Sequence, residues 1–134
     1  MNNMFLKITS PDGEIFSGEA RSILVTTDNG EIQILAGHAD LMAPIATGRA
    51  KLTLPDGTER AAAVSGGFIL VSKKETSVIA TTFEFSDTID VERAKRAKAE
   101  AEERLKNSNN AKDIELAKAK LQRALSRINI ASEK

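Results

Sequence analysis

Cysteine is absent from the 134-residue sequence, and this excludes disulfide bridges, thiolate metal sites and cysteine nucleophiles. Without covalent cross-links, the fold must be stabilised by the burial of apolar side chains. Hydrophobic residues make up 41% of the chain and charged residues 28%, which is typical of a folded protein rather than a disordered one. The length corresponds to about one domain with a core of its own.

Long apolar runs are also absent, since the longest have four residues, at 61–64 and 68–71. A helix that crosses a bilayer needs about 20 consecutive apolar residues. The first residues lack the basic-then-apolar order of a secretory signal. We therefore expect a protein that does not insert into the membrane and that stays in the compartment where it is made.

Histidine occurs once, at His38, and no second histidine or thiol exists to form a metal cluster or a catalytic pair with it. We expect a structural or interface role for this residue. The glycine pair in SGG (65–67) lacks the helix start and the lysine of a phosphate-binding loop. No pattern typical of catalytic residues or metal ligands is present, so we predict a protein that is not an enzyme.

Aromatic residues make up only 4% of the chain, and none follows Phe85. Binding of single-stranded nucleic acid relies on aromatic side chains that stack on bases. The C-terminal segment is rich in basic residues, but acidic residues alternate with them. Nucleic-acid binding is therefore not expected.

Glycine, proline and charge are unevenly distributed along the chain. All eight glycines and all three prolines precede Phe68. Residues 1–86 carry 7 basic and 10 acidic residues, whereas residues 87–134 carry 12 and 9. Such a change in composition marks a boundary between two kinds of structure. We predict two domains, 1–86 and 87–134.

The first domain has the pattern of an antiparallel β-sandwich or barrel. In RAKLTL (49–54) apolar and polar residues alternate, as expected for a strand with one buried face. Turn signals recur at short intervals and separate β-rich runs: PDG at 11–13, DNG at 28–30, PDG at 55–57 and SGG at 65–67. This spacing predicts eight to ten short strands.

The second domain has the periodicity of two helices joined by NSNN (107–110). The first apolar stripe is Val91, Ala94, Ala101 and Leu105, and the second is Ile114, Ala117, Leu121, Ala124 and Ile128. Alanine seams bury little apolar area, and at roughly 25 cal/mol per Å2 they give weak cohesion. We therefore predict an antiparallel two-helix hairpin that is able to move.

The segment TIDVERA (88–94) lies at the start of the first helix. Asp90 is placed to accept a hydrogen bond from the backbone N–H of Arg93, an N-cap worth roughly 1 kcal/mol. The cap accounts for the aspartate and leaves the arginine unexplained.

Five segments, in this order and spacing, closely resemble the epsilon subunit of the F-type ATP synthase: LKITSPDGEIFSG (6–18), ILAGHADLM (34–42), VSGGF (64–68), TIDVERAK (88–95) and LQRALSRI (121–128). The resemblance covers essentially the whole chain. It departs at Gln33 and Ala36, where the family usually has glycine and proline. The fold implied is of the α+β class, a ten-stranded antiparallel sandwich followed by a two-helix hairpin.

The function that the resemblance implies is that of a non-catalytic subunit of the central stalk, which couples ion flow to rotation. The sandwich would bind the gamma subunit and the membrane c-ring, and the resemblance assigns Glu31, His38, Leu41 and Met42 to this interface. The helices would switch between a compact form and an extended form that reaches the alpha/beta catalytic head and inhibits ATP hydrolysis. The implied location is the cytoplasmic face of the bacterial cell membrane, as a peripheral protein.

The resemblance also implies that TIDVERA binds ATP. Bacterial relatives that bind ATP share the pattern I/L-D-x-x-R-A, which Ile89, Asp90, Arg93 and Ala94 match. Glu84, Arg123 and Arg127 match further contacts, while Glu100 stands where those relatives have arginine, so we expect weaker binding.

ATP would be a regulatory ligand, and no cofactor is required. Two alternatives stay open: an ATP-sensing module that acts without a motor, and a β-sandwich adaptor that has no ligand.

Overall fold

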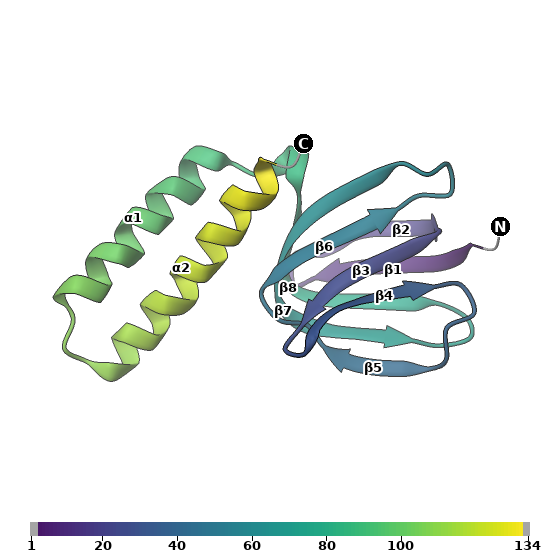
Figure 1. The fold of residues 1–134 in the computed structure, drawn as a ribbon, viewed down its shortest axis with the longest axis horizontal. Coiled ribbons are helices and arrows are strands. Elements are labelled where there is room, and N and C mark those ends of the chain that lie inside the picture. Colours follow the sequence, from purple (N-terminus) through teal and green to yellow (C-terminus); the bar gives the residue numbers. More distant parts are fainter. Residues whose placement is uncertain (1–2, 133–134) are drawn as a thin grey trace.

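The computed structural model describes residues 3–132, which form eight strands, a short 3-10 helix and two α-helices (Figure 1). The strands are β1 (Met4–Ser10), β2 (Gly13–Ala20), β3 (Ser22–Thr27), β4 (Gly30–Leu35), β5 (Leu41–Pro44), β6 (Gly48–Thr53), β7 (Glu59–Val71) and β8 (Thr76–Phe85). The helices are η1 (Ser86–Thr88), α1 (Val91–Asn107) and α2 (Ala111–Ala131).

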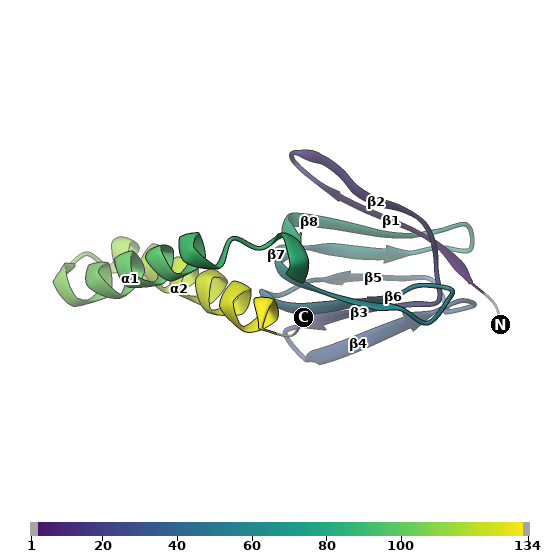
Figure 2. The ribbon, with the colours of Figure 1, turned by 90° about the horizontal axis from the view of Figure 1, so that it is seen from above.

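The strands form one sheet that folds over into two layers (Figures 1 and 2). Their order is β2-β1-β8-β7-β6-β3-β4, with β5 paired to β7. The two longest strands, β7 and β8, pair with each other along most of their length and bend together from one layer into the other. The first half of β7 pairs with β6 and its second half with β5.

Glycines at 66 and 67 make this bend possible. Gly66 and Gly67 have φ of 66° and 119°, which side chains rarely adopt. A Cβ on Gly67 would lie 2.0 Å from the carbonyl oxygen of Ile79, so the two strands approach more closely than any side chain allows. Beside the bend, the hydroxyls of Ser65 and Thr82 are hydrogen-bonded at 2.6 Å.

The predicted sandwich followed by a helical hairpin is confirmed, with two corrections to the sheet. Eight strands form within residues 3–132 where ten were expected, because β7 and β8 each contribute to both layers as one continuous strand. The sheet is not wholly antiparallel, since β1 and β8 run parallel over Leu6–Thr9 and Thr76–Ile79. One edge of β1 pairs with β2 in a hairpin, and its other edge pairs with β8, which runs in the same direction as β1.

The main core lies between the two layers and is built only from residues of the sandwich. Its buried members run from Leu6 to Phe85. The alternation in RAKLTL is confirmed, since Ala50 and Leu52 are buried whereas Arg49 and Lys51 are only half-buried.

The two helices pack antiparallel and are joined by residues 108–110. The turn predicted at 107–110 is confirmed, except that Asn107 is the last residue of α1. The Asn110 side chain caps α2 by accepting hydrogen bonds from the N–H groups of Lys112 and Asp113, at 2.9 and 3.3 Å. The buried residues of the seam are alanines: Ala94, Ala101, Ala117 and Ala124. The turn between the helices lies at the end of the hairpin that is farthest from the sandwich (Figure 1).

The hairpin meets the sandwich through a small area at the C-terminal end of α2. Ile130 and Ala131 form a cluster with Ala63 of β7 and Ile89 of the connecting segment. Nearby, the Ser126 hydroxyl donates to the carbonyl oxygen of Gly48 at 3.3 Å. We call this arrangement, with the hairpin against the sandwich, the docked hairpin. So small a contact stabilises it only weakly, as expected for a hairpin that is able to move.

Candidate functional site

Asp90 caps α1 as the sequence predicted. Its carboxylate accepts a hydrogen bond from the N–H of Arg93 at 3.0 Å, and its backbone is extended, with φ −82° and ψ 97°. Asp90 and the side chain of Arg93 both line a pocket next to the cap, so the pair has contacts available beyond capping.

This pocket, of about 350 Å3, lies between the end of β8, the first turns of α1 and the C-terminal half of α2, and we call it the hinge pocket. Its lining residues are Glu84, Thr88, Asp90, Arg93, Ala94, Ala97 and Arg127. Five of the seven residues predicted to bind ATP are therefore brought together from three separate elements. The volume lies within the roughly 300–1,000 Å3 that is usual for ligand sites.

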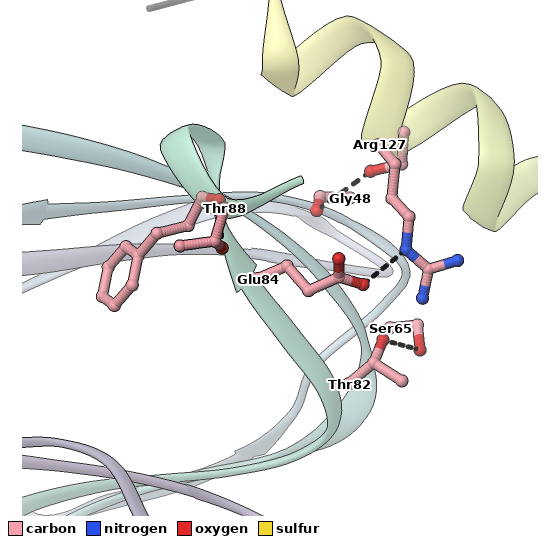
Figure 3. Close-up of polar contacts among 8 residues, drawn as sticks. Gly48, Ser65, Thr82, Glu84, Thr88 and Arg127 are labelled. Carbon is pink, nitrogen blue, oxygen red and sulfur yellow. Dashed lines mark hydrogen bonds and ion pairs between the residues drawn. The ribbon is translucent and has the colours of Figure 1, made fainter. Parts of the chain in front are cut away.

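An ion pair between Glu84 and Arg127 closes one side of the hinge pocket. Nε of Arg127 lies 2.6 Å from Oε1 of Glu84, and the side chains are 25% and 35% exposed respectively. The terminal nitrogens of Arg127 point away from Glu84 (Figure 3). Because Glu84 engages only Nε, the forked end of the guanidinium is available for an anion.

A second hollow of about 450 Å3 runs along the hairpin between α1 and α2, and we call it the hairpin groove. It shares Arg93, Ala97 and Arg127 with the hinge pocket, so the two are adjacent. Its full lining is Arg93, Arg96, Ala97, Glu100, Ala101, Arg104, Lys120, Arg123 and Arg127. The groove therefore contains six cationic side chains and one carboxylate.

The predicted ATP residues fall into three groups in the structure. Glu84, Asp90, Arg93, Ala94 and Arg127 line the hinge pocket, and Arg123 lines the adjoining groove. Ile89 lines neither, because its side chain is buried with Ala63 and Ile130. It holds the segment that carries Asp90 against the sandwich.

Four polar residues of these hollows had no predicted role: Thr88, Arg96, Arg104 and Lys120. The Thr88 hydroxyl donates to the carbonyl oxygen of Phe85 at 2.8 Å, which stabilises η1. On α1, positions 93, 97, 100 and 104 recur at helical spacing, which places them on one face. That spacing was visible in the sequence, but the residues of α2 that face these positions depend on the register in which the two helices pack.

The residues predicted for the subunit interface lie at two ends of the sandwich. Glu31 stands at the start of β4, near the hairpin, where it pairs with Arg49 at 3.3 Å. His38 lies beyond the other end of β4, and Leu41 and Met42 begin β5 nearby. The Met42 side chain is 69% exposed. The structure thus groups His38 with Leu41 and Met42 and separates them from Glu31.

None of the helices within residues 3–132 is long and apolar enough to cross a membrane. In the same part of the chain, no three acidic or histidine side chains converge in a way that would hold a metal ion.

Comparison with known families identifies the chain. The family model "ATP synthase, Delta/Epsilon chain, beta-sandwich domain" matches residues 3–86, and "ATP synthase, Delta/Epsilon chain, long alpha-helix domain" matches residues 87–132. The chain belongs to the ATP synthase delta/epsilon family. The resemblance inferred from the sequence is confirmed. So is the prediction of a non-catalytic subunit, because that is what the members of this family are.

Individual relatives match over their full length. The ATP synthase epsilon chain of Bacillus pumilus is 39% identical over 133 residues, covering 99% of this chain and 100% of that one. The epsilon chain of Staphylococcus aureus (strain JH9) is 40% identical over 135 residues, covering 100% of both chains.

Two solved structures share the fold. One is a chain of the Euglena gracilis mitochondrial ATP synthase (OSCP/F1/c-ring), with a TM-score of 0.82, 22% identity and coverage of 98% of this chain and 82% of that chain. The other is a chain of the Tetrahymena thermophila mitochondrial ATP synthase (central stalk/c-ring), with a TM-score of 0.62, 10% identity and coverage of 98% and 96%.

Proposed function

We propose that the chain is the epsilon subunit of the central stalk of a rotary F-type ATP synthase. The sandwich binds the gamma subunit and the c-ring, and the hairpin inhibits ATP hydrolysis when it extends into the alpha/beta catalytic head. The family match and the relatives named epsilon chain support the subunit assignment. The complex holds the subunit at the cytoplasmic face of the bacterial cell membrane as a peripheral protein.

ATP regulates the hairpin by binding in the hinge pocket. The observation that carries this proposal is the convergence of Glu84, Asp90, Arg93 and Arg127 around one pocket between the sandwich and the hairpin. The carboxylates accept hydrogen bonds from the adenine amino group or order the arginines, while Arg93, Arg123 and Arg127 bind the triphosphate. Charge-assisted hydrogen bonds of this kind contribute about 1.5–3 kcal/mol each.

A ligand in this pocket favours the docked hairpin because its walls come from both parts of the chain. ATP at ten times its Kd stabilises the docked form by about 1.4 kcal/mol. When ATP is scarce, the clustered arginines repel one another and the hairpin opens. The switch therefore inhibits hydrolysis only when the cell runs low on ATP. Glu100 repels the phosphates, so binding is weaker than in relatives that have arginine there.

Calorimetry tests ATP binding directly. ATP titrated into the full chain is expected to give a saturable heat, and the double variant Asp90→Ala/Arg93→Ala to give none. The control is the matched variant Glu92→Ala/Lys95→Ala, on the same turn of α1 but outside the hinge pocket, which should bind as the natural chain does. Equal heats from all three proteins would leave Asp90 as a helix cap only.

The assembly surface is tested by substitutions at the two ends of the sandwich. Glu31→Lys and His38→Trp are each expected to weaken binding to a gamma–c-ring complex by about tenfold, roughly 1.4 kcal/mol. Both side chains are exposed, so the melting temperature should change little. Unchanged affinity in both variants would contradict this interface.

The two alternatives are separated from the motor by co-purification. A subunit of the central stalk is recovered with the membrane ATPase, whereas an independent ATP-sensing module or a ligand-free adaptor is not.

A further inference from the structure

The hairpin groove extends well beyond the residues that the proposed nucleotide site uses. Arg104 lies eleven residues after Arg93 on α1, and a helix rises 1.5 Å per residue, so Arg104 is roughly 16 Å farther along the axis. On the facing helix, Lys120 lies seven residues before Arg127, roughly 10 Å along the axis of α2. Arg104 and Lys120 line this outer part.

The cations of the groove have few anionic partners within the chain. Of the basic residues that line it, Arg127 alone forms an ion pair among residues 3–132. Arg96, Arg104, Lys120 and Arg123 have no carboxylate of the described residues within pairing distance, and Glu100 is the one acidic residue in the lining. Like charges on two facing walls repel each other, and a bound anion removes that repulsion.

The lining specifies the chemistry of that anion. Arginine and lysine side chains are hydrogen-bond donors and have no acceptor, so the ligand must offer acceptors throughout. Among the lining residues only Ala97, Ala101 and Glu100 are not cationic, so the polar contacts that the groove offers are almost all from positively charged donors. Guanidinium groups bind phosphate oxygens in a bidentate geometry. The cationic side chains are arranged along the two facing helices, and this arrangement suits a linear ligand.

We infer that the hairpin groove binds linear inorganic polyphosphate, with chains longer than a triphosphate reaching Arg104 and Lys120. This goes beyond the proposed function, because no adenosine is required and the hinge pocket need not be filled. Polyphosphate carries only acceptor oxygens and a charge on every unit. An acidic peptide fits less well, since its backbone N–H groups need acceptors and Glu100 is the single acceptor side chain in the lining.

The test is calorimetry on the full chain at physiological salt with three probes: tripolyphosphate, a linear polyphosphate long enough to span the groove, and oligoglutamate of equal charge. The long polyphosphate should bind at least about tenfold more tightly than tripolyphosphate, since one added charge-assisted contact contributes about that much. Arg104→Gln/Lys120→Gln should remove this advantage and leave tripolyphosphate binding unchanged. Both substituted side chains are exposed, so the substitutions should not disturb the fold.

The matched control is Lys106→Gln/Lys118→Gln, which removes the same charge from the same helices outside the groove. It should keep the full preference for the long chain. Equal affinity for the short and long phosphates would overturn the inference, as would equal losses in the two variants. Oligoglutamate that binds as tightly as polyphosphate would overturn it in favour of an acidic peptide. Long-chain binding without any ATP binding would support it and contradict the proposed nucleotide site instead.

Discussion

A chain that ends at Ser86 is expected to remain folded and, in a reconstituted catalytic head, to leave ATP hydrolysis uninhibited. The main core is complete by Phe85, so the truncation removes no residue from it. What the sandwich loses is the cover that Ile89, Ile130 and Ala131 provide over Ala63. It also loses polar contacts, among them the ion pairs Glu84–Arg127 and Arg60–Asp87 and the hydrogen bond from Ser126 to Gly48. The truncation also removes the whole hairpin, which in the proposed function reaches the head.

Two measurements check this prediction. Denaturant unfolding of the truncated chain should remain one cooperative transition. At an ATP concentration below the Kd of the hinge pocket, hydrolysis by a head that lacks its own epsilon subunit should fall when the full chain is added and stay high with the truncated chain. A gradual transition would show that the hairpin belongs to the sandwich core, and inhibition by the truncated chain would contradict the role of the hairpin.

Substitution of Gly67 by alanine is expected to destabilise the sandwich by about 2–6 kcal/mol, a large part of the 5–15 kcal/mol that is usual for a domain. A positive φ in a non-glycine residue costs about 1–3 kcal/mol. The added Cβ would also overlap the carbonyl oxygen of Ile79, 2.0 Å away, so β7 and β8 must separate where they bend. Forced overpacking of this kind costs a further 1–3 kcal/mol or so.

Gly13→Ala is the matched control for Gly67→Ala. Gly13 has a φ of 125°, close to the 119° of Gly67, but a Cβ there would meet no atom within 4 Å. It should therefore show the conformational cost alone. Equal losses in the free energy of unfolding for the two variants would mean that the close approach of the strands is unimportant.

Features set by neighbouring residues could be predicted from the sequence, whereas those set by distant contacts could not. The cap at Asp90, the alanine seam and the turn between the helices depend on residues a few positions apart, and all are present in the structure. The continuous bend of β7 was not foreseen. SGG at 65–67 is compatible with a turn between two strands and also with a bend within one strand. The pairing of this segment with β8 decides for the bend, and that pairing is not visible in the local sequence.

The candidate site divides in the same way. Glu84, Arg93 and Arg127 became candidates through the family resemblance, because no local pattern joins residues from β8, α1 and α2. Arg96, Arg104 and Lys120 were missed because the hairpin groove exists only once the two helices have packed in their particular register. Ile89 has the residue type that the ATP-binding pattern requires, but its side chain lies in a buried apolar cluster and not in the hinge pocket.

The most direct test of the regulatory account is the distance between the hairpin tip and the sandwich, with and without ATP. Since the chain has no cysteine, Asn29→Cys and Asn109→Cys introduce the sole thiols for spin labels, both at exposed turns. With ATP we expect one narrow distance distribution that matches the docked hairpin. Without ATP we expect a second, longer population, and in Asp90→Ala/Arg93→Ala no response to ATP. A distribution in the natural chain that is the same with and without saturating ATP would contradict the account.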